Sequence, residues 1–361
     1  MSIEGISDSG EVVPFEQEWT YRDFLAGVVT KVGQGFITPF WLLQESLHHS
    51  ILPLHSGEYG QSRSGFQEVV MRIFWGVFFK APAFLTSMPF AAVGVVLNGI
   101  GNILHTKDYR VDCGKFRGEM NKDTKLMLLN PHMLRGGIPL WNQGLTPASN
   151  RLDRLIATVR DNNPDIVFLP EVSASIRASV RNALSDRYHY FFSNMGKRML
   201  GLDASFFIAF RGTLKSVPQF IPFKNQDLVM ERGFFTFETH DTRYFFTYYP
   251  SLDDLKEICT LNMEGKKIVL MGDLGFERGS PSFEYLQKQG FVSGLKERTS
   301  TETNAPYLHL YNIEEEEKKV EKAMIFIKQG EGVSQLAPMH LNSKIDQALS
   351  NQSMVLTKIL A

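Results

Sequence analysis

Three polar residues follow short apolar runs, at points where buried strands are expected to end. They are Asn130 after 126–129, Glu171 after 165–169, and Asp273 after 268–271. Mg²⁺ prefers oxygen ligands and keeps several waters, so one glutamate aided by one amide can hold it. A lone glutamate after a strand is commonly a solvated loop residue. Because Asn130 and Asp273 also follow predicted strands, a binding site is favoured here. We therefore predict a site at which Glu171, aided by Asn130, holds Mg²⁺.

The elements that would position these side chains are short β-rich runs from Lys125 onward. Each has four to six residues, the length of buried strands: 126–129, 165–169, 205–210, 234–237, 244–248, 268–271 and 324–327. Apolar residues at helical spacing over Ser149–Arg160 predict a helix that ends before Asn163 and Pro164. Strands interleaved with fewer helices, including a hairpin-like pair around Glu238–Arg243, favour an α/β (α+β) fold. We expect a two-sheet β-sandwich flanked by helices, not a parallel doubly wound sheet.

The order of these strand ends resembles the endonuclease/exonuclease/phosphatase superfamily, which has the DNase I-like fold. Its signatures are a strand ending in Asn, a helix, a strand of the type Pro-Asp-Ile-hydrophobic-Gln-Glu, and later Gly-Asp-Phe-Asn. Here they read Leu129-Asn130, Asp165-Ile-Val-Phe-Leu-Pro-Glu171 and Gly272-Asp-Leu-Gly275. The resemblance implies that Glu171 binds Mg²⁺ with Asn130 in support. It also implies that Asp273 helps to position the attacking water and the phosphate.

Several catalytic positions of that superfamily are changed in this chain. Gly275 stands where Gly-Asp-Phe-Asn has its Asn, and Asn351 and Gln352 stand where active members have Asp-His before the last strand. Glutamine cannot accept a proton near neutral pH, and asparagine cannot stabilise an imidazolium. A second family histidine, in Thr-His-Leu at the end of the strand after the hairpin, is replaced within Tyr244-Phe-Phe-Thr-Tyr-Tyr-Pro250 by tyrosines. Because losing a general base costs about 10²- to 10⁴-fold in rate, we expect impaired catalysis.

Four other histidines are candidates for a replacement base. His240 falls in the predicted hairpin connection, where a turn role is favoured, and His132 lies two residues after Asn130, where a surface loop is favoured over a relocated base. His309 fits a half-buried strand, and His340 precedes the degenerate Asn351-Gln352 by about ten residues. None of the four restores the mechanism from the sequence alone.

The N-terminal region, 19–105, has a different character. It contains two apolar segments, 24–54 and 73–104, separated by the polar stretch 55–63. Charges in the first segment, and prolines and asparagines in the second, make both poor spanning helices. We expect an apolar helical hairpin inserted shallowly and monotopically, with Trp41, Trp75, Pro89 and Phe90 at the membrane. The alternative is a pair of buried helices packed on the following domain.

This hairpin region resembles that of the membrane-attached neutral sphingomyelinase family of animals, where two hydrophobic segments precede the same catalytic fold. The matching stretches are Thr38-Pro-Phe-Trp-Leu-Leu43, Ser50-Ile-Leu-Pro53 and Ser87-Met-Pro-Phe-Ala-Ala-Val-Gly94. That family also has a regulatory Asp and Lys five residues apart. Asp227 and Arg232 stand at that spacing, with Arg in place of Lys. The resemblance implies a lipid phosphodiester as the ancestral substrate.

Composition sets further limits. The formal net charge of −1 and the pI of about 6.8 give no electrostatic drive toward nucleic acid, which is not expected as a partner. Cys113 and Cys259 form no metal-binding or redox motif, which favours a reducing, cytosolic side. The first 18 residues are polar and acidic, so no cleavable signal peptide is expected. The predicted division is a polar tail (1–18), the hairpin region (19–105), a linker (106–124) and the sandwich domain (125–361).

Two functional hypotheses follow from these observations. The first is a membrane-associated, degenerate metallophosphodiesterase-like protein of sphingomyelinase-like ancestry, which binds a lipid headgroup, a phosphate or a protein partner. The alternative is an active Mg²⁺-dependent phosphodiesterase of sphingomyelinase, phosphoinositide phosphatase or nuclease type, with a relocated general base.

Overall fold

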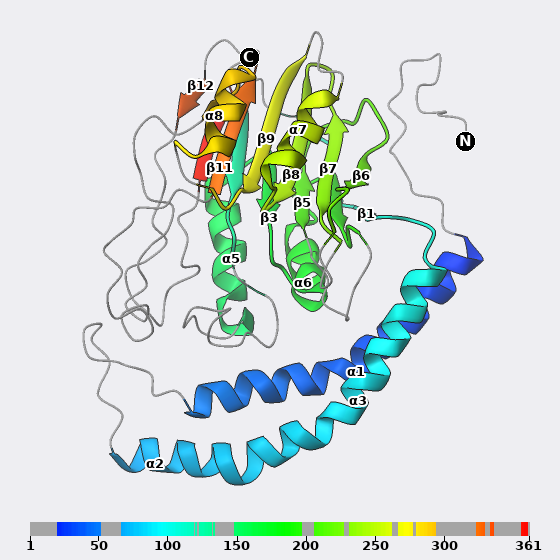
Figure 1. The fold of residues 1–361 in the computed structure, drawn as a ribbon, viewed down its shortest axis with the longest axis vertical. Coiled ribbons are helices and arrows are strands. Elements are labelled where there is room, and N and C mark those ends of the chain that lie inside the picture. Colours follow the sequence, from blue (N-terminus) through cyan, green and yellow to red (C-terminus); the bar gives the residue numbers. More distant parts are fainter. Residues whose placement is uncertain are drawn as a thin grey trace.

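The computed structural model describes most of the 361-residue chain. The described residues are 20–51, 66–118, 120, 123–131, 133, 148–196, 206–226, 231–261, 266–276, 279–293, 323–328, 333–335 and 355–359. Their helices are α1 (Tyr21–Ile51), α2 (Phe66–Trp75), the π-helix η1 (Gly76–Lys80), α3 (Ala81–Leu104), α5 (Ala148–Asn162), α6 (Ala174–Leu184), α7 (Leu252–Thr260) and α8 (Pro281–Lys288). Figure 1 shows two parts: a β-sandwich with its helices, and a long helical hairpin beside it.

The sandwich is built from two mixed sheets. The first has the order β1 (Arg110–Cys113), β4 (Tyr190–Ser193), β5 (Phe207–Phe210), β3 (Ile166–Leu169), β2 (Thr124–Leu128), β13 (Val355–Ile359) and β12 (Val333–Gln335). The second has the order β10 (Val292–Ser293), β11 (Ala323–Lys328), β9 (Lys267–Asp273), β8 (Thr242–Tyr248), β7 (Gly233–Glu238) and β6 (Gln219–Pro222). Each sheet contains one parallel pair of neighbours described here, β2 with β3 and β8 with β9.

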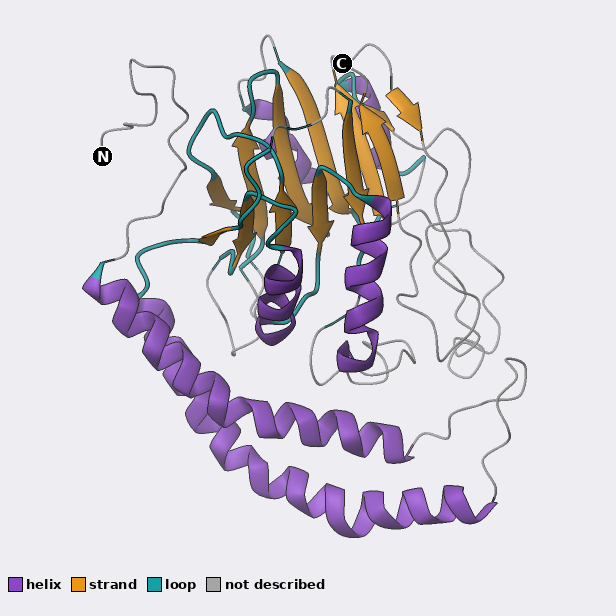
Figure 2. Cartoon of the chain, turned by 180° about the vertical axis from the view of Figure 1, so that it is seen from behind, coloured by secondary structure: helices purple, strands orange, loops and turns teal. Residues whose placement is uncertain are grey.

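Alternating side chains of the central strands fill two different cores. In β3, Phe168 points into an aromatic-rich core between the sheets, whereas Val167 packs on the other face under α5 and α6. In β8, Phe246 joins the core between the sheets, and Phe245 packs toward α7 and α8. The result is a four-layer arrangement of helices, sheet, sheet and helices. Figures 1 and 2 show the two sides of this sandwich.

The predicted fold class is confirmed: the chain is an α/β two-sheet sandwich flanked by helices, with an N-terminal apolar helical hairpin. The seven predicted strand runs correspond to β2, β3, β5, β7, β8, β9 and β11, and the predicted helix to α5. Residues 106–124, expected to be a linker, contain β1, which pairs with β4 at the edge of the first sheet. The missed strands β1, β4, β6, β10, β12 and β13 are short or carry mixed polar patterns that give no strong period.

The hairpin helices α1 and α3 pack closely on one another through small and polar residues. A Cβ added to Gly94 would lie 2.5 Å from the carbonyl oxygen of Gly33, and one added to Gly101 would lie 2.2 Å from Thr30 Oγ1. Asn98, with no exposed surface, lies at the same crossing. Side chains this small let two helix backbones approach, as in helix pairs within membranes.

The outer surface of the hairpin is apolar. Its exposed large hydrophobic residues include Phe24, Val28, Val32, Phe36, Leu42, Phe74, Trp75, Val77, Phe78, Phe79, Leu85, Met88, Phe90, Val93, Val96, Ile100 and Ile103. Among the described helices, Ile73–Leu104 is long and apolar enough to cross a membrane by length and composition, and only 17% of its most apolar window is buried. A helix in the core of a soluble protein would be mostly buried. The hairpin therefore turns its small and polar residues inward and its apolar residues outward.

A buried carboxylate joins the two ends of the hairpin at its base. Asp23, near the start of α1, accepts hydrogen bonds from Thr20 and from the backbone N–H and hydroxyl of Thr106, just past α3. Burial alone would raise the pKa of Asp23, but the hydrogen bonds from Thr20 and Thr106 outweigh it and hold the pKa well below its usual range. The charged carboxylate therefore fixes α1 to the segment that leads into β1.

Candidate functional site

The candidate site lies where the carboxyl ends of two parallel strand pairs meet, one pair from each sheet. In the first sheet, Asn130 and Glu171 each come two residues after the ends of β2 and β3. In the second sheet, Tyr248 and Asp273 are the last residues of β8 and β9 and stand opposite one another in the register. Parallel neighbours end on the same side of a sheet, so the two pairs deliver four polar side chains to one edge of the sandwich.

Asn130 and Asp273 connect the two sheets directly. The Asn130 side-chain amide donates a hydrogen bond of 3.1 Å from Nδ2 to Asp273 Oδ2, and neither residue has exposed surface. Buried polar groups are stable only when they are hydrogen-bonded, and this bond fixes the orientation of the Asp273 carboxylate. Two of the three residues predicted from strand ends are thus in contact, although they are 143 positions apart in the sequence.

Glu171 is half-buried and its carboxylate accepts a hydrogen bond from the hydroxyl of Tyr248. Burial, followed by the charges of Glu171 and Asp273, raises the pKa of Tyr248 far above its usual range. The phenol therefore keeps its proton at neutral pH and acts as a donor to Glu171. Tyr248 also stands opposite Asp273 in the β8–β9 register, so the two residues are neighbours at this edge.

The backbone of Glu171 adopts the left-handed conformation, with φ of 56°. A residue other than glycine seldom adopts this conformation unless the surrounding structure holds it there. The Glu171 carbonyl accepts a 3.0 Å hydrogen bond from the N–H of Met133, and Met133 forms a parallel bridge with Val172. These bonds extend the β2–β3 pairing past the strand ends and support the unusual backbone that presents Glu171.

Tyr249 and Gly275 fit together on the other side of the site. Gly275 has φ of 66°, and a Cβ added there would lie 2.5 Å from Cδ1 of the Tyr249 ring. Tyr249 has φ of 47° and donates its N–H to the Asp273 carbonyl at 2.8 Å. Its ring packs edge-on against Tyr248, with centroids 4.6 Å apart. The ring thus fills the space beside residue 275, where the resembled superfamily carries the Asn side chain.

Arg232, predicted as half of a regulatory pair, has a positioning role in this structure. Its guanidinium donates to the carbonyl of Tyr249 and forms a 3.0 Å ion pair with Asp254, the residue that completes the capping box of α7. These bonds tie the start of β7 and the start of α7 to the backbone beside the site. Asp227, the other member of the predicted pair, lies outside the described residues.

Of the four candidate histidines and the pair Asn351 and Gln352, the structure describes only His240. His240 lies in the β7–β8 turn with its side chain 90% exposed, as predicted for a turn residue. The turn is at the start of β8 and Tyr248 at its end, and seven residues of strand span about 20 Å, so His240 does not reach the site. Asn351, Gln352, His132, His309 and His340 lie outside the described residues.

A divalent cation would find oxygen donors of the right kind at this edge. Glu171, Asp273 and Asn130 are hard ligands suited to Mg²⁺, which needs few protein ligands because it keeps its own waters. Within the described part of the chain, no three His, Cys, Asp or Glu side chains group as a metal cluster. The donor set fits a loosely held Mg²⁺ bound through Glu171, with Asn130 orienting Asp273. The hydroxyl of Tyr248, however, already engages one Glu171 oxygen.

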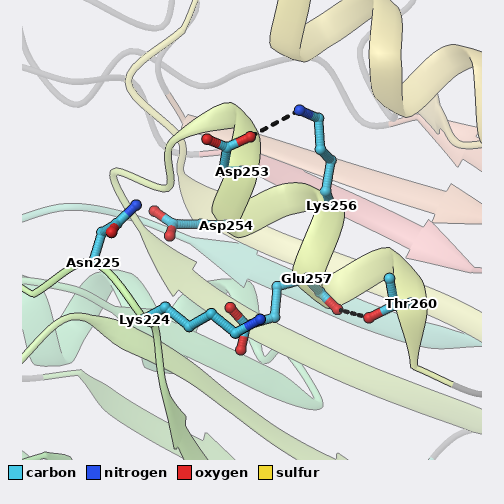
Figure 3. A pocket seen from close by; sticks show the side chains of 7 residues that line it. All are labelled: Lys224, Asn225, Asp253, Asp254, Lys256, Glu257 and Thr260. Atoms are coloured by element: carbon cyan, nitrogen blue, oxygen red, sulfur yellow. Dashed lines mark hydrogen bonds and ion pairs between the residues drawn. The ribbon is translucent and has the colours of Figure 1, made fainter.

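A concavity of about 320 Å³ lies around α7. Figure 3 shows its lining side chains, Lys224, Asn225, Asp253, Asp254, Lys256, Glu257 and Thr260. Lys256 pairs with Asp253 at 2.8 Å, and Thr260 donates to the carbonyl of Glu257. Its lining includes none of the four site residues, and its opposite charges partly satisfy one another. We therefore place the candidate site at the strand ends.

Comparison with known proteins gives matches to structures only. No protein-family model matches the sequence, and no curated protein matches it either. Similar solved structures include truncated TDP2 from Caenorhabditis elegans, with 14% identity, a TM-score of 0.47, and coverage of 66% of this chain and 98% of that one. SmcL has 16% identity and a TM-score of 0.48, covering 66% and 99%. An endonuclease/exonuclease/phosphatase family protein from Bacteroides thetaiotaomicron has 13% identity and a TM-score of 0.47, covering 66% and 97%.

The two mixed sheets, with helices on their outer faces, form the two-sheet sandwich that the motif resemblance predicts.

Proposed function

We propose that this chain is a membrane-associated, catalytically impaired metallophosphodiesterase-like protein of sphingomyelinase-like ancestry that binds a phosphate-bearing lipid headgroup at the edge formed by Glu171 and Asp273. The observation that carries the proposal is the apolar outer surface of the hairpin. That surface is far more extensive than the scattered exposed hydrophobic residues of an ordinary soluble domain.

The hairpin has polar and small residues inside and apolar residues outside, the reverse of a soluble protein, and this supports a lipid surface as its partner. Buried Asn98 and the small residues Gly94 and Gly101 line the helix crossing, while Phe90 and Val96 are 57% and 62% exposed. In water this arrangement would leave apolar area hydrated at about 25 cal/mol per Å². In the boundary between headgroups and acyl chains, the same area is buried. Trp75, 48% exposed, suits the interface, where tryptophan is enriched.

Impaired catalysis is supported by the residues around Glu171. Tyr248 occupies the position after Thr247, where the resembled superfamily has the histidine of Thr-His-Leu, and a phenol with a strongly raised pKa does not accept a proton from water. Gly275 has no side chain to replace the superfamily's Asn. A carboxylate pair and an amide remain, which can bind a phosphate-bound cation and its waters.

Vesicle co-flotation of the full chain tests the membrane proposal. Val96→Glu places a charge on the apolar surface, and we expect it to lower the vesicle-bound fraction at least tenfold, because a charged side chain is costly to insert. Val292→Glu is the matched control, since Val292 is 64% exposed but lies on β10 of the sandwich. We expect it to bind vesicles as the unchanged chain does.

Equal binding by all three proteins would show that the hairpin surface is not what holds the chain at a membrane.

An active phosphodiesterase with a relocated base is the second candidate. The observation that favours it is the convergence of Asn130, Glu171 and Asp273, which a purely structural protein does not need. The two candidates differ in turnover and not in fold.

A further inference from the structure

We propose that Tyr248 is a gate on the metal position: its hydroxyl donates to one oxygen of the Glu171 carboxylate, and a divalent cation takes this carboxylate as a ligand only when the phenol leaves. This inference rests on the site half of the proposed function and is independent of the membrane half. The hydrogen bond from Tyr248 to Glu171 carries it.

The phenol and a cation would each stabilise the negative charge of Glu171 and Asp273, but in different ways. The Tyr248 hydroxyl donates to Glu171, and Asp273, which has no exposed surface, is held at the same edge by the Asn130 amide. A cation would offset this negative charge directly. The neutral phenol instead supplies one hydrogen bond to a charged acceptor, among the stronger hydrogen bonds in proteins. The two therefore compete for one carboxylate.

Packing keeps the phenol in place. The Tyr248 ring packs against the core between the sheets, and the Tyr249 ring lies edge-on against it. The Arg232 guanidinium donates to the Tyr249 carbonyl, and the Tyr249 N–H donates to the Asp273 carbonyl, so the backbone of Tyr249 is in turn fixed. The closed position is therefore held by β7, β8, β9 and the start of α7. A ligand that displaced Tyr248 would open Glu171 to the cation.

Binding of Mn²⁺, as a spectroscopic substitute for Mg²⁺, tests the gate without any substrate. The full chain is titrated in detergent and bound Mn²⁺ is measured by electron paramagnetic resonance, with Mg²⁺ as competitor. Tyr248→Phe keeps the ring and removes the hydroxyl. We expect it to bind Mn²⁺ about tenfold more tightly than the unchanged chain, since a hydrogen bond to a charged group is lost from the competing state.

Two further variants make the result specific. Tyr249→Phe removes the hydroxyl of the neighbouring ring and leaves the Tyr248–Glu171 bond in place, so we expect unchanged Mn²⁺ affinity. In the double variant Tyr248→Phe/Glu171→Gln, we expect the gain to disappear.

Affinities of the unchanged chain and Tyr248→Phe within twofold of one another, weaker binding by Tyr248→Phe, or no binding by either would overturn the gate. None of these outcomes bears on vesicle flotation, so the gate and the membrane proposal fail separately.

Discussion

At the scale of single residues, the site depends on a close fit between neighbours. Gly275 has no side chain and the Tyr249 ring fills the space beside it, while Tyr248 donates its hydroxyl to Glu171. Tyr249 and Gly275 therefore depend on one another. The effect of a substitution at one of them on the free energy of unfolding should therefore depend on the residue at the other.

Gly275→Ala tests this dependence. We expect it to lower the free energy of unfolding by about 2–4 kcal/mol, the sum of a left-handed backbone and overpacking against the Tyr249 ring. Gly279→Ala is the control, because Gly279 has φ of 85° but no atom within 4 Å of an added Cβ. Gly279→Ala should lower the free energy of unfolding only by the cost of the left-handed backbone, roughly 1–2 kcal/mol. In the presence of Tyr249→Ala, the effect of Gly275→Ala should fall to that of the control. Unfolding in denaturant measures the free energy of unfolding of each variant.

What the sequence could predict at this scale follows from chain direction. Asn130, Glu171 and Asp273 each follow an apolar run, so their place at strand ends was predictable. The bond between Tyr248 and Glu171 was not, because it joins the end of β8 in one sheet to the end of β3 in the other. No local pattern specifies which strand ends face one another across a sandwich.

At the scale of elements, the hairpin depends on the glycines at its helix crossing. A Cβ at Gly94 would lie 2.5 Å from the Gly33 carbonyl and from Ile37, whereas one at Gly99 on the same helix meets nothing within 4 Å. We expect Gly94→Ala to destabilise the hairpin by about 1–3 kcal/mol through overpacking. Gly99→Ala should stabilise it by about 0.5–1 kcal/mol through helix propensity.

Thermal unfolding of the two variants in detergent, followed by helical circular dichroism, would measure these opposite signs. A similar shift for both would mean that α1 and α3 do not cross at Gly94.

The base of the hairpin should respond to acid. The pKa of Asp23 is lowered in the folded state, so its stabilisation is fully present above the unfolded pKa of about 3.9 and is lost as the pH falls toward the folded value. His105 is a titratable neighbour: its Nδ1 lies 3.7 Å from Asp23 Oδ1 and accepts the N–H of Lys107.

We expect Asp23→Asn to cost about 2 kcal/mol of stability at pH 7, from weakened hydrogen bonds to a charged acceptor. The difference from the unchanged chain should hold down to about pH 5 and shrink below about pH 4. Unfolding measured as a function of pH would show it. A difference that instead grows in acid would rule out Asp23 as a charged acceptor.

At the scale of the whole molecule, the chain joins a hairpin with an apolar outer surface, for which we propose a lipid partner, to a sandwich whose polar edge carries two carboxylates. The fold class followed from the sequence because strand-length apolar runs and a long apolar helix pair are strong local signals. The close α1–α3 packing and the closing of the site by tyrosines depend on contacts between distant segments. These could be known only from the structure.

The most direct test of this account is turnover of phosphodiester substrates by the full chain on vesicles with saturating Mg²⁺. Sphingomyelin, phosphoinositides and single-stranded nucleic acid cover the alternatives, and Glu171→Ala is the matched inactive control. The account predicts that the unchanged chain releases no more product than Glu171→Ala while still binding the vesicles. Release of product by the unchanged chain that Glu171→Ala abolishes would contradict it and would establish an active enzyme.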